Sequence, residues 1–220
     1  MLHTTELTLY LDDQPLLTLP PLTVAPGEVL TLMGPSGCGK SSLLAALAGV
    51  LPPGGPIRLA GEIRLGERLL TPLAPQARRI GMLFQDDLLF AHLTVAENLM
   101  FGMPAHLRGM AARRARALEA LAEVGLEGQA DKLPGQLSGG QKARVSLLRA
   151  LLAEPEALLL DEPFSRLDKP LRAAFRTLVF ERLKTLGIPA LLVTHDEEDA
   201  PGAILTLTTP CLTKEDSDLV

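Results

Sequence analysis

A short apolar run that ends abruptly at a cluster of glycines places the tightest constraint on what this chain can fold into. Val29–Met33 has the composition of a buried strand, residues 34–42 (GPSGCGKSS) follow it, and residues 41–50 have a helical pattern. Glycine is favoured where the backbone turns left-handed or approaches another group closely. The sequence therefore predicts a strand, a tight glycine-rich turn and a helix, in that order.

The turn carries the pattern G-x-x-x-x-G-K-[ST], at Gly34, Gly39, Lys40 and Ser41. In such a turn the backbone N–H groups surround phosphate oxygens, and the start of the next helix adds a positive dipole end. We expect Lys40 to reach the β- and γ-phosphates of a nucleotide and Ser41 to place its hydroxyl on Mg²⁺. The pattern arises by chance in roughly one random chain in a hundred of this length. It does not by itself separate kinases, GTPases, motors and transport ATPases. The expected nucleotide-binding residues of this loop are Gly34, Pro35, Ser36, Gly37, Cys38, Gly39, Lys40, Ser41 and Ser42.

Length and composition fit one globular domain. The chain has 220 residues, 47% of them apolar and 21% charged, which is too apolar for a disordered protein. No apolar run approaches the length of a membrane span, and the N-terminus lacks a signal peptide, so we predict a protein kept in the cytosol. The net charge of −5 argues against a dedicated nucleic-acid binder, and the basic run 108–116 is interpreted as a solvated helix face. The two cysteines, Cys38 and Cys211, show no zinc-ligand spacing.

Short apolar runs alternate with helical patterns along the rest of the chain. Strands are predicted at 7–11, 80–84, 157–160 and 190–194, with a strand pair over 57–65 and a turn at 12–15; helices are predicted at 111–124, 140–153 and 170–186. Strands that alternate with crossover helices indicate an α/β fold with a parallel sheet covered on both faces. The helical stretch from about residue 86 to 150 is interpreted as an insertion.

Two predicted strands end in polar residues that suit phosphate chemistry. The run ALLLDEP ends in Asp161, which is suited to hold Mg²⁺, and Glu162, which is suited to orient and deprotonate an attacking water. The alternative is a plain strand-to-turn boundary with exposed acids. The run LLVTHD ends similarly, and His195 could donate to a γ-phosphate or be merely structural. In an open parallel sheet such strand ends gather at one edge, where ligands bind.

A further glycine pair lies in LSGGQ, residues 137–141. Ser138 is a good N-cap for the helix that follows. The residues alone allow two interpretations of equal weight, a capped helix start or a second phosphate site.

Taken together, GPSGCGKSS, LSGGQ, LLLDEP and VTHD, in this order, resemble the ATP-binding subunits of ABC transporters over almost the whole chain. The pattern is most similar to single-domain importer subunits of the thiamine, ferric iron, polyamine or sulfate type, among them an enterobacterial importer ATPase. The resemblance implies a P-loop NTPase (RecA-like) parallel-sheet core with an N-terminal antiparallel β subdomain and an inserted α-helical subdomain. It implies one ABC ATPase domain over 1–220, with the core in 1–85 and 151–220, the helical signature subdomain in 86–150, and no C-terminal regulatory domain.

The resemblance also implies a homodimer in which two subunits sandwich two ATP molecules. Each ATP would lie between the phosphate loop of one subunit and the signature turn of the other, formed by Ser138, Gly139, Gly140 and Gln141. Gln85 matches the glutamine that senses Mg²⁺ and the attacking water, and it joins Ser41 and Asp161 as a metal ligand. His195 matches the switch histidine, Asp168 lies in the loop that crosses the dimer interface, and Tyr10 roughly matches the aromatic residue that stacks on adenine.

A few positions depart from the family pattern. Ser42 stands where threonine is usual, and Lys142 and Ala143 replace the usual Arg-Gln after the signature. Tyr10 lies one residue further from the loop than in relatives. The tail over 203–220 is short and its strand-hairpin finish is eroded.

The function that the resemblance implies is ATP hydrolysis that drives transport of a small solute, most simply import. The partners would be integral membrane permease subunits and a periplasmic or extracellular solute-binding protein, with no nucleic acid, at the cytoplasmic side of the cell inner membrane. An exporter subunit and an ABC ATPase outside transport are the alternatives. The transported solute is not encoded in this chain.

Overall fold

Residues 1–207 are described by a computed structural model, which has a parallel sheet at its centre. The strand order is β12-β5-β11-β10-β9, and every neighbouring pair runs parallel. The segments between most of these strands are long and contain helices, because a strand reaches a parallel neighbour only through a crossover connection. The prediction of an α/β fold with a parallel sheet is confirmed. The strands are β5 (Val29–Met33), β9 (Ile80–Leu83), β10 (Ala157–Asp161), β11 (Ala190–Val193) and β12 (Ile204–Thr206).

Two smaller antiparallel sheets carry most of the N-terminal part of the chain. Their strand orders are β4-β1-β7-β8 and β3-β2-β6. The predicted strand pair over 57–65 is wrong as a pair, because β6 joins β2 whereas β7 joins β1. The chain changes sheet at Gly61, where φ is +109° and a Cβ atom would lie 2.3 Å from the Glu6 carbonyl oxygen. The bounds are β1 (Leu2–Thr4), β2 (Leu7–Leu11), β3 (Gln14–Leu19), β4 (Leu22–Val24), β6 (Ile57–Ala60), β7 (Ile63–Leu65) and β8 (Arg68–Leu69).

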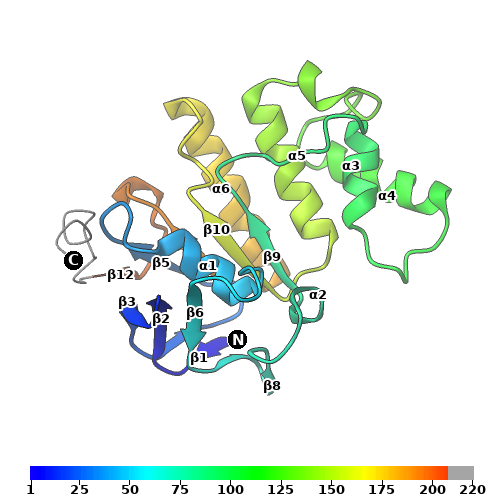
Figure 1. The fold of residues 1–220 in the computed structure, drawn as a ribbon. Coiled ribbons are helices and arrows are strands. Elements are labelled where there is room, and N and C mark those ends of the chain that lie inside the picture. Colours follow the sequence, from blue (N-terminus) through cyan, green and yellow to red (C-terminus); the bar gives the residue numbers. More distant parts are fainter. Residues whose placement is uncertain (208–220) are drawn as a thin grey trace.

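Helices cover both faces of the parallel sheet (Figure 1). The side chains of α1 share a hydrophobic cluster with Leu159 and Leu191, whereas α5 and α6 share one with Leu158 and Leu192. Consecutive strand residues point to opposite faces, so nearly every position in β10 and β11 is buried. The bounds are α1 (Lys40–Ala48), α2 (Pro75–Arg78), α5 (Gly139–Leu152) and α6 (Lys169–Leu186), and the 3₁₀ turns are η1 (Pro134–Gln136) and η2 (Glu197–Asp199).

A separate group of helices, α3 (Val95–Gly102), α4 (Met110–Ala122) and the first part of α5, packs around its own apolar cluster. Figure 1 shows these helices on the side of the molecule away from β1, β2 and β3. Helix α3 was not anticipated, although Thr94 and Glu97 carry the signal of a capping box, which forms with the Thr94 hydroxyl accepting from the Glu97 N–H. The basic run is also not simply a solvated face. Arg113 donates to the carbonyl oxygens of Met100, Pro104 and Leu107, so it closes the end of α3.

Candidate functional site

The loop between β5 and α1 turns sharply at two glycines. Gly37 and Gly39 have φ of +82° and +90°, and Gly39 is the N-cap of α1. Behind the loop, Leu16 Cδ2 lies 3.0 Å from where a Cβ atom of Gly39 would be, so a side chain there would meet both strain and a packed neighbour. The side chain of Cys38 is buried in the cluster beneath the loop, which leaves only its backbone to face a ligand.

Lys40 lies folded into this loop. Its Nζ atom donates to the carbonyl oxygens of Gly34, at 2.8 Å, and Pro35, at 2.7 Å, and the residue is only 8% exposed. A buried ammonium needs such oxygens because an unpaired charge is costly away from water. The loop therefore holds a cation at the start of a helix, an arrangement that suits an anion with several phosphate oxygens.

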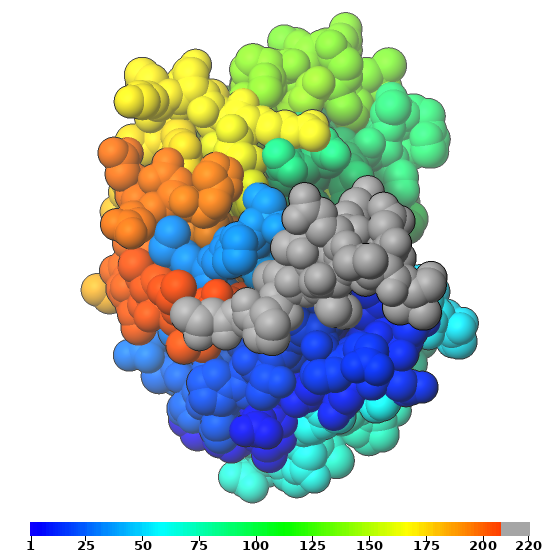
Figure 2. All heavy atoms as spheres, turned by 60° about the vertical axis from the view of Figure 1, so that its left-hand side comes forward, coloured from blue at the N-terminus to red at the C-terminus, as the bar shows by residue number. Residues whose placement is uncertain are grey.

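The register of the parallel sheet brings the acidic strand end beside this loop. Leu83 of β9 pairs with Leu160 of β10, which pairs with Leu192 of β11. The residues immediately beyond these positions therefore lie along one edge of the sheet. Figure 2 looks onto this part of the surface, where the light-blue segment after β5 lies beside the orange segment after β11.

Asp161 meets Ser41 at this edge, with the Ser41 hydroxyl donating to Asp161 Oδ1 over 3.1 Å. Burial raises the pKa of Asp161 above its ordinary value, and the hydrogen bond from Ser41 partly opposes that shift. A hydroxyl and a carboxylate oxygen are hard donors, and Mg²⁺ is commonly held by one or two such groups together with phosphates. The donor set therefore fits Mg²⁺.

Glu162 and His195 form a second pair. Glu162 Oε2 lies 3.2 Å from His195 Nδ1, and the two side chains are 27% and 62% exposed. Glu162 has φ of +47°, an uncommon conformation for a residue other than glycine, and such strain is concentrated at functional sites. A pocket of about 280 Å³ is lined by this glutamate and by Ser36, Gly37, Gly39, Lys40, Ser41 and Ser42.

Gln85 follows β9 at the same edge and is exposed. Gln85 lies two residues after Leu83, and Glu162 lies two residues after Leu160, the partner of Leu83 in the sheet. The chain beyond Gln85 is held by α5, since Ser146 donates to the Asp87 carbonyl oxygen at 3.0 Å and Arg149 to that of Leu88 at 2.9 Å. No local sequence pattern indicates that Ser146 and Arg149 hold this loop.

Ser138–Gln141 form the start of α5 and are not among the residues that line the phosphate pocket. Ser138 is the N-cap, and it exchanges hydrogen bonds with Gln141 in a capping box. Gly139 is exposed with open space around it, whereas a Cβ atom at Gly140 would lie 2.3 Å from Leu171 Cδ2. The capped-helix interpretation is confirmed as local structure, and the turn still presents unbonded N–H groups, as the first turn of any helix does.

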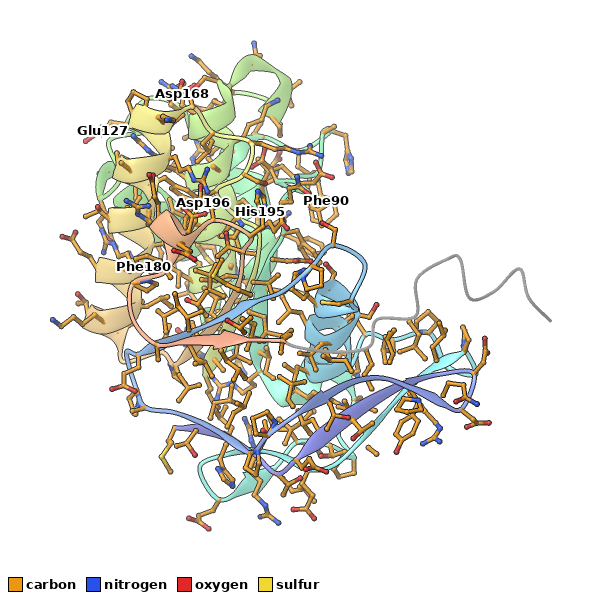
Figure 3. The ribbon with its side chains drawn as sticks, turned by 90° about the vertical axis from the view of Figure 1, so that its left-hand side faces the viewer. Phe90, Glu127, Asp168, Phe180, His195 and Asp196 are labelled. Atoms are coloured by element: carbon orange, nitrogen blue, oxygen red, sulfur yellow. The ribbon has the colours of Figure 1, made fainter. Side chains whose placement is uncertain are left out.

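The two remaining predicted residues lie apart from the pocket. Asp168 is the N-cap of α6 and accepts from the Leu171 N–H at 3.0 Å; Figure 3 shows it at the first turn of α6, with His195 and Asp196 on the segment after β11. The ring of Tyr10 is covered by the Arg58 guanidinium, 4.0 Å from its centroid. Adenine stacking by Tyr10 stays a prediction. Cys211 and the tail beyond 207 lie outside the described residues.

Comparison with known proteins places these features in context. The family model described as ABC transporter matches residues 19–165. The chain is 49% identical over 202 residues to the uncharacterized ABC transporter ATP-binding protein YnjD of Escherichia coli K12, covering 92% of each. It is 48% identical to the thiamine import ATP-binding protein ThiQ of Cereibacter sphaeroides, covering 81% of this chain and 75% of that one. The Fe(3+) ions import ATP-binding protein FbpC 1 of Rhizobium meliloti is 44% identical over 81% of this chain, which spans about half (49%) of that protein.

Solved structures of an ATP-binding cassette also match this chain. The ATP-binding cassette MJ0796, in a dimeric post-hydrolysis state bound to ADP and Pi, superposes with a TM-score of 0.77 at 30% identity, covering 94% of both chains. A second dimeric structure of that cassette gives a TM-score of 0.76 at 31% identity. Among residues 1–207, no helix combines the length and the apolar character that crossing a bilayer requires.

Proposed function

The chain belongs to the ABC transporter family as an ATP-binding, ATP-hydrolysing subunit with the P-loop NTPase fold, and on this premise we propose that it powers solute import through a separate membrane permease. The names of the relatives support import over export, because they include thiamine and Fe(3+) import subunits. The corresponding partners are integral permease subunits and a solute-binding protein, and the site of action is the cytoplasmic face of the membrane. The basic run 108–116 does not support a nucleic-acid partner, because its Arg113 is engaged in hydrogen bonds to backbone carbonyl oxygens.

One observation carries the proposed mechanism: the parts expected to contact a nucleotide lie in two separate places. The loop 34–42, Asp161, Glu162 and His195 lie together, whereas the exposed Gly139 turn lies elsewhere. A second copy of the chain could supply the missing turn to each pocket. The dimeric cassette structures support this homodimer, in which each ATP is held between two chains.

Within each site the residues divide the work by their chemistry. The loop N–H groups and Lys40 bind the phosphates, and Ser41, Asp161 and Gln85 would hold Mg²⁺, which supplies charge neutralisation at the phosphates. Glu162 accepts the proton of the attacking water, and His195 donates to the γ-phosphate region. Because Glu162 and His195 are already 3.2 Å apart, the base and the donor are placed before nucleotide arrives.

We also propose a division of labour between the core (1–85 and 151–220) and the helical part (86–150). The helical part has its own apolar cluster, so it can rotate as a unit when the dimer closes. After hydrolysis the γ-phosphate no longer bridges the two chains, and the dimer opens. These two states would supply the cycle that a transporter needs.

The Glu162→Gln variant tests whether two chains hold ATP between them. At saturating Mg-ATP it should retain ATP and form a dimer of twice 23.5 kDa, measured by light scattering, because hydrolysis no longer releases the contact. The same variant with Ser138→Arg added is the control, since a bulky cation at the turn should keep the chain monomeric. A Glu162→Gln protein that stays monomeric under these conditions would contradict the sandwich.

Partner identity needs a separate experiment. The tagged chain should co-purify from detergent-solubilised membranes with an integral permease. Recovery of nucleic acid or ribosomes in place of a permease would favour the alternative of an ABC ATPase outside transport.

A further inference from the structure

A largely buried ion-pair network joins the segment after β11 to the first turns of α6. The carboxylate of Asp199 is only 2% exposed, and Arg172 of α6, 20% exposed, meets it with two guanidinium nitrogens. The Nε–Oδ1 distance is 2.9 Å. Arg176 also faces this carboxylate, at 3.5 Å. The planar fork of an arginine fixes the orientation of such a pair in a way that a lysine cannot.

The network holds the backbone on both sides of His195. On one side, the Thr194 hydroxyl donates to Asp199 Oδ2 over 3.1 Å. On the other side, Arg172 contacts Asp196 Oδ2 at 2.8 Å, and the Asp196 N–H donates to the Thr194 hydroxyl at 3.1 Å. His195 makes its own side-chain contact with Glu162, while the residues before and after it are tied to α6.

The composition of the network indicates more than a contribution to stability. A buried ion pair is often no better for stability than apolar residues of similar volume, because desolvation offsets the attraction. Here the buried carboxylate accepts from Arg172 and from Thr194, so the network has a directed geometry that apolar residues could not supply. The side chain whose place it fixes is His195, which lies beside the expected base.

We propose that Arg172 is a positioning residue that sets the orientation of His195 by tying the segment 194–199 to α6. This inference rests on the proposed function, in which His195 acts on the γ-phosphate. Arg172 is not among the residues that line the phosphate pocket, and in this proposal it acts through the residues on either side of the histidine. A misplacement of about 1 Å can cost up to about 10²-fold in rate, so loss of the fork should affect turnover more than binding.

The test uses Arg172→Lys, which keeps the charge and removes the fork. We expect kcat for ATP hydrolysis to fall by about 10- to 100-fold with the KM for ATP within about twofold of wild type. The matched control is Arg182→Lys, on the same helix, whose guanidinium is 29% exposed and pairs with Glu123 away from His195. The control should retain kcat and KM within about twofold. Wild-type kcat in Arg172→Lys would overturn the proposal.

A second comparison separates positioning from a general structural effect. In single-turnover hydrolysis, Arg172→Lys combined with His195→Ala should be no slower than His195→Ala alone, because both changes remove one function. If the rate reductions of the two single variants multiplied in the double variant, the proposal would be overturned. If Arg172→Lys does not fold, judged by circular dichroism, Asp199→Asn takes its place with the same expected outcomes. A near-wild-type hydrolysis rate in His195→Ala would refute the role of His195 in the proposed function. A slow His195→Ala together with a wild-type rate in Arg172→Lys would refute only this inference.

Discussion

The two regions proposed to hold a nucleotide are built in different ways. The pocket at the edge of the parallel sheet combines strand ends far apart in sequence, and its groups already contact one another, as Ser41 does Asp161 and Glu162 does His195. The signature turn at the start of α5 is local, since Ser138 and Gln141 satisfy each other. The first region is preorganised by the fold, and the second is a surface feature that, in the proposed homodimer, acts on the nucleotide of a second chain. Substitutions in the pocket should therefore affect ATP hydrolysis, and substitutions in the turn should affect ATP-dependent dimerisation.

The largest expected effect lies in the sheet-edge pocket. Glu162→Gln should slow ATP hydrolysis by about 10²–10⁴, the range for loss of a general base, while ATP binding is retained. Glu154→Gln is the matched control, because Glu154 also has a positive φ, +52°, but it does not line the phosphate pocket. Steady-state phosphate release and equilibrium binding of labelled ATP measure the two quantities. If Glu162→Gln hydrolysed ATP as fast as Glu154→Gln, Glu162 could not be the general base.

The next comparison is between the two glycines of the signature turn. Gly140→Ala should lower the free energy of unfolding by about 1–3 kcal/mol, because the new methyl group would overlap Leu171. Gly139→Ala should leave it unchanged or raise it by up to about 1 kcal/mol, because the added atom meets open space and alanine favours a helix. Urea denaturation measures both. If the two variants had equal stability, α6 would not press on the turn at Gly140.

Two equivalent capping boxes allow a finer comparison. Thr94→Ala and Ser138→Ala should each lower the free energy of unfolding by about 1 kcal/mol, because each removes an N-cap acceptor. Only Ser138→Ala should also reduce ATP-dependent dimerisation, measured by light scattering in the Glu162→Gln background. A similar loss of dimer in Thr94→Ala would show that the effect comes from stability and not from the turn.

The smallest expected effect concerns the charge on Asp161. Because burial raises its pKa in the folded chain, the protonated form favours folding, and this contribution is lost as the pH rises through the raised pKa. Without Mg²⁺ at neutral pH, Asp161→Asn should therefore raise the free energy of unfolding by up to about 1 kcal/mol, and the gain should disappear as the pH falls toward 4. Thermal unfolding at several pH values measures this. A lower free energy of unfolding for Asp161→Asn than for wild type at neutral pH would contradict this prediction.

The parts of the fold that follow from local signals could be predicted from the sequence. The phosphate loop, four of the five strands of the parallel sheet and the helix start at Ser138 carry patterns within a few residues, whereas β12 and the N-cap Asp168 were not predicted. The pairing of β6 and β7 could not be predicted, because it depends on a change of sheet at Gly61 and on partners elsewhere in the chain. Arg113 was misassigned for a similar reason, since its carbonyl partners at the end of α3 are not encoded beside it.

The same limit holds for the candidate site. The residue types at 40, 41, 161, 162 and 195 suggested their chemistry, and the structure brings these residues together. Their roles in binding and hydrolysis stay predictions. Residues that orient others, such as Arg149 and Arg172, have no signature of their own, because any exposed helix could carry an arginine at that position.

The first turn of α6 touches two features that serve different nucleotides. Leu171 presses on Gly140, and the next residue, Arg172, holds the segment that carries His195. In a symmetric dimer of the proposed kind, His195 faces the ATP bound by its own chain, whereas the turn at Gly140 faces the ATP bound by the other chain. The two α6 helices and the two nucleotides then form a closed ring of contacts. In that proposed dimer, loss of the γ-phosphate at one site would change the surroundings of both α6 helices and so couple the two sites.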